Sequence, residues 1–150
     1  GFSTTITSDV APLNNLIQKA LEAGPHIHVL RDPTRGGVAT TLNEIALQSN
    51  VKIVLNEEFL PIHRQVQGAC DILGFDPLYV ANEGKVLIIG PEDEENLVLN
   101  ALHNHPLGEN AVRIGIVEKA ESNPIVLMKT LIGGTRIVDM LTGEMLPRIC

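Results

Sequence analysis

Helical and strand-like apolar patterns alternate through most of this chain, and strand patterns alone follow after Gly108. Pro12–Ala23 and Val38–Ser49 carry apolar residues at helical spacing, and further helices are expected from Pro61 to about Leu73 and from Pro91 onward. The first helix has its apolar face at Leu13, Leu16, Ile17, Ala20 and Leu21, and the second at Val38, Leu42, Ile45 and Ala46. This alternation is typical of proteins whose helices cover a sheet.

Short strand patterns lie between and after these helices. They cover His26–Leu30, Val51–Leu55, Lys85–Ile89, Val112–Glu118, Ile125–Lys129 and Arg136–Met140. Gly133-Gly134, between the last two patterns, is typical of a two-residue hairpin turn. The elements together predict one α/β (α+β) sandwich over residues 1–141, with helices packed on a mixed β-sheet. Residues 142–150 are expected to form a mobile tail outside this domain.

The composition limits both the core and the classes of partner. Of the 150 residues 44% are hydrophobic, but only 3% are aromatic and none is Trp, so the core must consist of Leu, Ile, Val and Ala. A net charge of −7 argues against nucleic acid and anionic membranes as partners. The sequence has no apolar stretch of about 18 residues, no visible signal peptide and no disulfide framework, which favours a cytoplasmic protein.

The sequence ends in a thiol, in the segment Leu146-Pro147-Arg148-Ile149-Cys150. An exposed terminal thiol invites oxidation and does little for a fold, so we interpret Cys150 as a carrier or acceptor of a chemical group. An extended arm from Gly143 reaches roughly 25 Å, and Pro147 stiffens it. The alternative is an accidental chain end. Cys70 lies in an apolar segment and is interpreted as a buried small hydrophobic residue.

The segment Arg31-Asp32-Pro33-Thr34-Arg35-Gly36-Gly37 joins a strand pattern to a helix pattern. Free N–H groups at a helix N-terminus bind anions, and Gly36 and Gly37 let a phosphate approach the backbone closely. Arg35 adds a charged fork, and Thr34 can cap the helix or donate a hydroxyl. A tight structural turn is the alternative. The segment is not a P-loop, because no Lys follows Gly37.

Other polar side chains are also open to two interpretations. Glu83 lies beside the strand from Lys85 and is either a general base or part of an ordinary surface turn. Glu92–Glu95 is interpreted as solvated charge that caps the helix from Pro91, and His103 and His105 as cations at the end of that helix.

A metal site is not expected. His26 and His28 would share one face of a strand, but neither this pair nor His103 and His105 is accompanied by a cysteine pair or an acidic cluster.

Two segments resemble the C-terminal half of the PurM-like superfamily of ATP-using enzymes. They are Arg31–Gly37 with its continuation Val38–Ala46, and Leu73–Lys85. This superfamily includes aminoimidazole ribonucleotide synthetase, selenophosphate synthetase, thiamine-monophosphate kinase and the HypE family. The ending Pro147–Cys150 resembles the HypE family, because the other members lack a thiol tail. The resemblance covers essentially the whole chain and implies a PurM C-terminal-like fold.

This resemblance implies an ATP-dependent carbamoyl dehydratase in [NiFe]-hydrogenase maturation. In the HypE family the carbamoyltransferase HypF loads a carbamoyl group onto a terminal cysteine, which matches Cys150. The thiocarbamate is then dehydrated to a thiocyanate, and its cyanide passes to the active-site iron on a HypC–HypD complex. Glu83 matches a family glutamate that acts as a possible base, while Thr34, Arg35, Gly36 and Gly37 match possible phosphate contacts.

The resemblance also implies an N-terminal ATP-binding domain that is absent from these residues. In the superfamily that half carries most of the site for ATP and Mg²⁺ and much of the homodimer barrel, so this segment alone is expected to be inactive. Two alternatives remain open. The chain is half of another ATP-dependent enzyme of the superfamily, with Cys150 incidental, or it is a non-catalytic docking domain whose tail binds partners.

Overall fold

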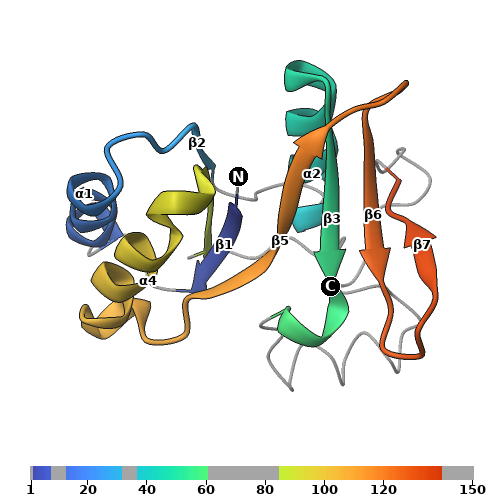
Figure 1. Cartoon of the computed structure of the whole chain (residues 1–150). Coiled ribbons are helices and arrows are strands. Elements are labelled where there is room, and N and C mark those ends of the chain that lie inside the picture. Colours follow the sequence, from blue (N-terminus) through green and yellow to red (C-terminus); the bar gives the residue numbers. More distant parts are fainter. Residues whose placement is uncertain (1, 8–12, 32–36, 61–84, 140–150) are drawn as a thin grey trace.

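The computed structural model describes residues 2–7, 13–31, 37–60 and 85–139 (Figure 1). The strands of this part are β1 (Phe2–Thr7), β2 (Val29–Arg31), β3 (Val51–Asn56), β4 (Lys85–Gly90), β5 (Val112–Lys119), β6 (Ile125–Lys129) and β7 (Thr135–Ile137). The helices are α1 (Leu13–Ala23), α2 (Gly37–Ser49) and α4 (Glu95–His103), with 3₁₀ turns η1 (Glu57–Phe59), η3 (Glu92–Glu94) and η4 (Pro106–Gly108).

The strands form one seven-stranded sheet in the order β2-β4-β1-β5-β3-β6-β7. Strands β3 and β6 pair in parallel, whereas β3 pairs antiparallel with β5 on its other side. The remaining pairs are antiparallel. The predicted mixed sheet with helices packed on it is therefore confirmed.

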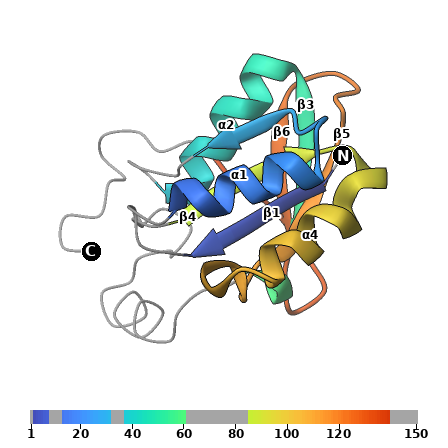
Figure 2. The ribbon, with the colours of Figure 1, turned by 90° about the vertical axis from the view of Figure 1, so that its left-hand side faces the viewer.

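The apolar core lies on both faces of the sheet. In β4, Leu87 and Ile89 pack into a cluster with α2, while the alternating residues Val86 and Ile88 pack into a second cluster with α1 and α4. Figure 2 shows the ribbons of α1 and α4 next to β1 and β4. The predicted apolar face of α2 is buried in full, and the buried hydrophobic residues of the described part are aliphatic or Met. On α1 the prediction was wrong for Leu21, which is 46% exposed.

The sequence patterns missed β1, which lies in the middle of the sheet. Thr4 pairs with Ile88 of β4 on one side and with Arg113 of β5 on the other. The segment contains Ser and Thr in place of a run of aliphatic residues, so its hydropathy is weak. Its signal was the high share of β-branched residues, which favour strands.

Two strand boundaries and one turn also differ from the predictions. His26 lies in a turn in which the N–H of Ile27 donates to Gly24 O, whereas the N–H of His28 donates to Ile89 O of β4. Strand β2 itself begins only at Val29. The prediction that the two histidines share one face of a strand is therefore wrong.

The last hairpin is wider than predicted. The N–H of Thr130 donates to Gly134 O over 2.8 Å, and that of Gly133 donates to Thr130 O over 3.1 Å. Gly133 has a φ of 91°, a conformation that favours glycine. The loop therefore has the pattern of a three-residue turn with a glycine bulge, and β7 is shorter than the predicted Arg136–Met140.

In the described parts of the chain, no helix combines the length and the hydropathy that crossing a membrane requires. The predicted helix from Pro61 and Cys70 both lie outside the described residues.

Gly115 of β5 lies directly against the backbone of β3. A Cβ atom there would lie 2.3 Å from the carbonyl oxygen of Val54 and 3.0 Å from the Cα of Leu55. Since both neighbours are backbone, we expect Gly115→Ala to lower the free energy of unfolding by about 1–3 kcal/mol. Equilibrium denaturation in urea measures this change. Gly134→Ala is the control, because its nearest neighbour is Thr130 Oγ1 at 3.4 Å. Equal losses for the two variants would contradict the close approach of the strands.

Candidate functional site

Gly37 is the predicted site residue that lies within the described part of the chain. It opens α2, is buried, and has a φ of 68°, which side chains rarely adopt. Its carbonyl oxygen accepts a hydrogen bond from Thr41 Oγ1 over 3.2 Å. The strand-to-helix connection predicted for Arg31–Gly37 is confirmed at both ends, because β2 ends at Arg31 and α2 begins at Gly37.

The position of Gly37 has a chemical consequence. Helix α2 is 13 residues long, and its first N–H groups have no partner within the helix. An anion held by the preceding segment would meet these donors and the positive end of the helix dipole. Thr34, Arg35, Gly36, Glu83 and Cys150 lie outside the described residues, so their roles stay predictions.

An ion pair ties the start of this connection to helix α2. Arg31 Nη2 donates to Glu44 Oε2 over 2.6 Å, and the two side chains are 35% and 41% exposed. The pair links the last residue of β2 to the middle of α2. The sequence analysis missed it, because charges 13 residues apart on different elements share no sequence pattern.

Asn43 makes a second link from the same helix. Its side-chain amide Nδ2 donates to the carbonyl oxygen of Ala39 over 2.9 Å and to that of Val138 over 2.8 Å. Val138 is fully buried, and its own N–H donates to Val126 O of β6 over 2.8 Å. The last described residues before position 140 are thereby attached to α2. No local sequence pattern indicates this bond, because its partners are 95 positions apart.

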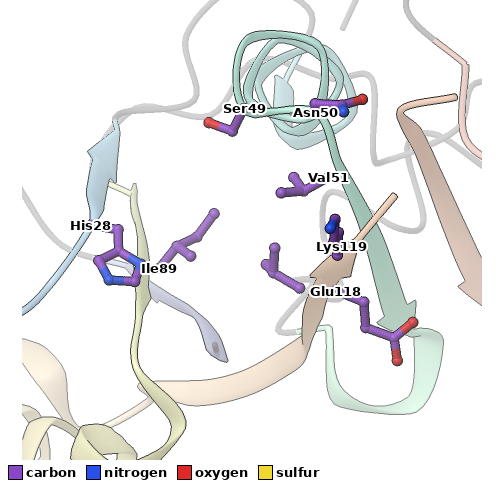
Figure 3. A pocket seen from close by; sticks show the side chains of 8 residues that line it. His28, Ser49, Asn50, Val51, Ile89, Glu118 and Lys119 are labelled. Atoms are coloured by element: carbon purple, nitrogen blue, oxygen red, sulfur yellow. The ribbon is translucent and has the colours of Figure 1, made fainter. Parts of the chain in front are cut away.

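A pocket of about 430 Å³ opens beside the sheet, where β5 continues beyond its pairing with β1 (Figure 3). Its described lining residues are His28, Ser49, Asn50, Val51, Ile89, Val117, Glu118 and Lys119. Figure 3 shows His28 and Ile89 on one side, with Ser49 and Asn50 at the end of α2 on the other. Gly37 is not among these lining residues, so the pocket and the described end of the motif are separate features.

The acidic turn before α4 is not a purely solvated cap. Glu94 is buried, and its two carboxylate oxygens accept hydrogen bonds from the ring Nδ1 and the backbone N–H of His26. Glu95 Oε1 accepts from Arg113 Nη1 over 3.3 Å. The prediction of solvated charge is therefore wrong for Glu94. Its carboxylate joins the turn after α1 to the start of α4, a link between residues 68 positions apart.

Burial by itself raises the pKa of Glu94, but the hydrogen bonds from His26 and the positive charges of His26 and His28 outweigh it and hold the pKa below its ordinary value. A carboxyl whose pKa is lowered on folding stabilises the fold above its ordinary pKa, and this contribution is lost as the pH falls through the lowered value.

We therefore expect Glu94→Gln to lower the melting temperature near neutral pH and to have less effect as the pH falls through the acidic range. Thermal unfolding followed by circular dichroism at a series of pH values measures this. The matched control is Glu92→Gln, because Glu92 lies in the same 3₁₀ turn and is exposed. A deficit of Glu94→Gln that stayed constant down to strongly acidic pH would contradict the assignment.

His105 lies beyond the last residue of α4, and its ring bonds to groups outside that helix. Its Nδ1 accepts the N–H of Leu107 over 3.1 Å, and its Nε2 lies 3.1 Å from Asn15 Oδ1. His105 caps η4, which starts at Pro106. His103 does lie in the last turn of α4, but its ring Nε2 bonds to Ala111 O over 2.6 Å, so it is not a cap of the helix carbonyls.

Comparison with known proteins relates the whole chain to one group. A family profile described as "AIR synthase related protein, C-terminal domain" matches residues 3–127. A protein of Cupriavidus necator described as "Carbamoyl dehydratase HypE" is 52% identical over 149 residues, which are 99% of this chain and 42% of that protein. The chain thus spans less than half the length of this curated relative.

Solved structures agree with the sequence comparison. A crystal structure of the hydrogenase maturation protein HypE in complex with ATP has a TM-score of 0.85 at 39% identity, covering 99% of this chain and 52% of that one. The structure of a HypE–HypF complex has a TM-score of 0.84 at 37% identity, covering 93% and 52%. These similarities confirm the predicted fold.

Proposed function

We propose, since this chain belongs to the family of AIR synthase related proteins through their C-terminal domain, that it is part of an ATP-dependent carbamoyl dehydratase of hydrogenase maturation. The observation that carries the proposal is the 52% identity, over 99% of the chain, to a relative described as a carbamoyl dehydratase. The predicted resemblance to the HypE family is confirmed by the same comparison. Activity, substrates and partners are proposed here for the full-length protein that contains this segment.

The reacting group in this proposal is carried by Cys150. Its thiolate accepts a carbamoyl group and holds it as a thiocarbamate, R–S–C(=O)–NH₂. The last described residue is Asp139, so the thiol follows 11 residues later along the chain. A segment of that length reaches roughly 35 Å when extended. This is enough to carry the thiocarbamate between a loading partner and an ATP site.

The γ-phosphate of ATP takes up the oxygen that the dehydration removes. The carbamoyl oxygen attacks the γ-phosphorus, the bond to the β-phosphate oxygen breaks, and ADP leaves. Two protons are then removed from nitrogen, the C–O bond breaks, and phosphate departs with that oxygen. The products are R–S–C≡N, ADP and phosphate. No electron donor or acceptor is required, because the carbon and nitrogen lose only the elements of water.

Two groups on this chain serve those steps. Glu83 is proposed as the base that takes a proton from nitrogen as phosphate leaves. Thr34, Arg35, Gly36 and Gly37 are proposed as contacts to the transferred phosphate. The position of Gly37 at the start of α2 supports this, because the first N–H groups of a helix have no partner within it and are suited to bind anions.

Mg²⁺ commonly accompanies ATP and is bound by carboxylate oxygens. No group of three or more His, Cys, Asp or Glu side chains among the described residues could hold a metal ion. We therefore derive no step through Mg²⁺ on this part of the chain. The main site for ATP and Mg²⁺ is proposed to lie in the N-terminal domain, and this segment alone is proposed to be inactive.

The proposed partners follow from the route of the carbamoyl group. The carbamoyltransferase HypF loads Cys150, and the solved HypE–HypF complex supports this assignment. A HypC–HypD complex receives the cyano group. The full-length protein is proposed to be a cytoplasmic homodimer.

Intact mass spectrometry tests the proposal. The full-length protein is incubated with the carbamoyltransferase, carbamoyl phosphate and ATP. We expect a mass increase of one carbamoyl group, followed by the loss of one water. A protein that stays unmodified beside a demonstrably active transferase would overturn the proposal and favour another ATP-dependent reaction. An adduct that never loses water would leave an acceptor domain without dehydratase activity.

A further inference from the structure

We infer that Asn43 is a positioning residue that fixes the origin of the arm bearing Cys150, an inference that rests on the proposed function. The amide of Asn43 holds the carbonyl of Val138, which lies only one residue before the last described position. It therefore holds the backbone two residues before position 140, from which the chain continues to Cys150.

The bond to Asn43 completes the anchoring of Val138. The N–H of Val138 is held by Val126 O, its side chain is fully buried, and its carbonyl oxygen is held by Asn43 Nδ2 over 2.8 Å. The residue is thus fixed from β6 on one side and from α2 on the other. Without the amide, the carbonyl of Val138 would lose this partner, and an unpaired polar group near the core is unfavourable.

Helix α2 connects this anchor to the phosphate-contact segment proposed above. Asn43 lies six residues beyond Gly37 on the same helix, roughly 9 Å along the axis. A helix keeps this spacing nearly constant. The arm therefore starts at a set distance from the motif that ends at Gly37. The ion pair between Arg31 and Glu44 attaches the first residue of that motif to the helix residue that follows Asn43.

A fixed origin matters because the reaction joins a tethered thiocarbamate to a bound phosphate. Twelve residues separate Val138 from Cys150, so the thiol stays within roughly 40 Å of its anchor. If the anchor loosens, the tethered group samples a larger volume and its effective concentration at the site falls. Small displacements of reacting groups cost about tenfold to a hundredfold in rate. Loss of the anchor should slow delivery without changing the binding of ATP.

The experiment compares Asn43→Leu and Asn43→Ser in the full-length protein with the arm already carbamoylated. Leucine removes both hydrogen bonds. Serine can still bond to Ala39 O from the preceding turn but is too short to reach Val138 O, so it isolates the second bond. For both variants we expect a single-turnover rate of dehydration at least about tenfold below wild type, with an unchanged KM for ATP. Asn100→Leu is the control, because Asn100 is exposed on α4.

Hydrogen exchange supplies a readout that does not depend on activity. Both variants should exchange the amide of Val138 faster than wild type, while the amides of β4 keep their protection and so show that the domain is folded. Dehydration at the wild-type rate in the two variants would overturn the inference, and so would a wild-type exchange rate at Val138. If the wild-type protein itself fails to dehydrate its arm, the proposed function fails and the inference falls with it.

Discussion

Cys150→Ala in the full-length protein is expected to abolish carbamoylation by the transferase and thus all thiocyanate formation. Alanine has no nucleophile that can hold the carbamoyl group, so the loss should be complete. Intact mass spectrometry after incubation with transferase, carbamoyl phosphate and ATP measures it as the absence of any adduct. ATP binding should be unchanged, because Cys150 carries the substrate and is not proposed to contact the nucleotide.

The matched control for this variant is Cys70→Ala, which alters the other cysteine of the chain. It should be carbamoylated and dehydrated like the wild-type protein. An adduct that persists in Cys150→Ala and disappears in Cys70→Ala would show that Cys70 is the acceptor and would contradict the role proposed for Cys150. Full activity of Cys150→Ala would favour the alternative in which the enzyme has another specificity and the thiol is incidental.

Glu83→Gln should lower the rate of dehydration by a factor of about 10²–10⁴, the range typical of general bases. Glutamine keeps the size of the side chain but cannot accept a proton. Loading of Cys150 precedes this step and should proceed at the normal rate. The thiocarbamate adduct would therefore accumulate, and single-turnover mass spectrometry would follow its slow loss of water.

The control for the base is Glu121→Gln, since Glu121 is exposed in the loop between β5 and β6. This variant should dehydrate its arm at the wild-type rate. A Glu83→Gln protein that is as fast as Glu121→Gln would remove Glu83 from the mechanism. It would leave the acceptor role of Cys150 intact.

The sequence predicted best those elements whose burial repeats along the chain. The apolar residues of α2 recur every three or four positions, and all four predicted residues of its buried face are in the core. The run Val86–Ile89 is continuously apolar, as expected for a strand buried on both faces. Strand β1, by contrast, has weak hydropathy because it contains Ser and Thr. Its pairing with β4 and β5 could therefore not be predicted from an apolar pattern of its own.

The polar network was much less predictable. The partners of Glu94 and Asn43 are 68 and 95 residues away, so no local pattern could reveal them. Glu94 in particular has the sequence context of an ordinary helix cap, and only the packing of the turn after α1 makes it a buried acceptor. Of the candidate site, the sequence correctly predicted a connection from a strand to a helix that ends at Gly37, the first residue of α2. The roles of Glu83 and Cys150 stay predictions.

The central place of β1 has a consequence for the order in which the chain can assemble. Phe2 pairs with Gly90 and Ile116, so β1 finds its neighbours only after most of the residues in this segment have been synthesised. Contacts of such long sequence separation slow folding. Until β4 and β5 leave the ribosome, both edges of β1 are without their native partners, and an unpaired strand edge favours aggregation. The pairing of β1 on both edges is thus completed late, although β1 precedes the other strands of this segment.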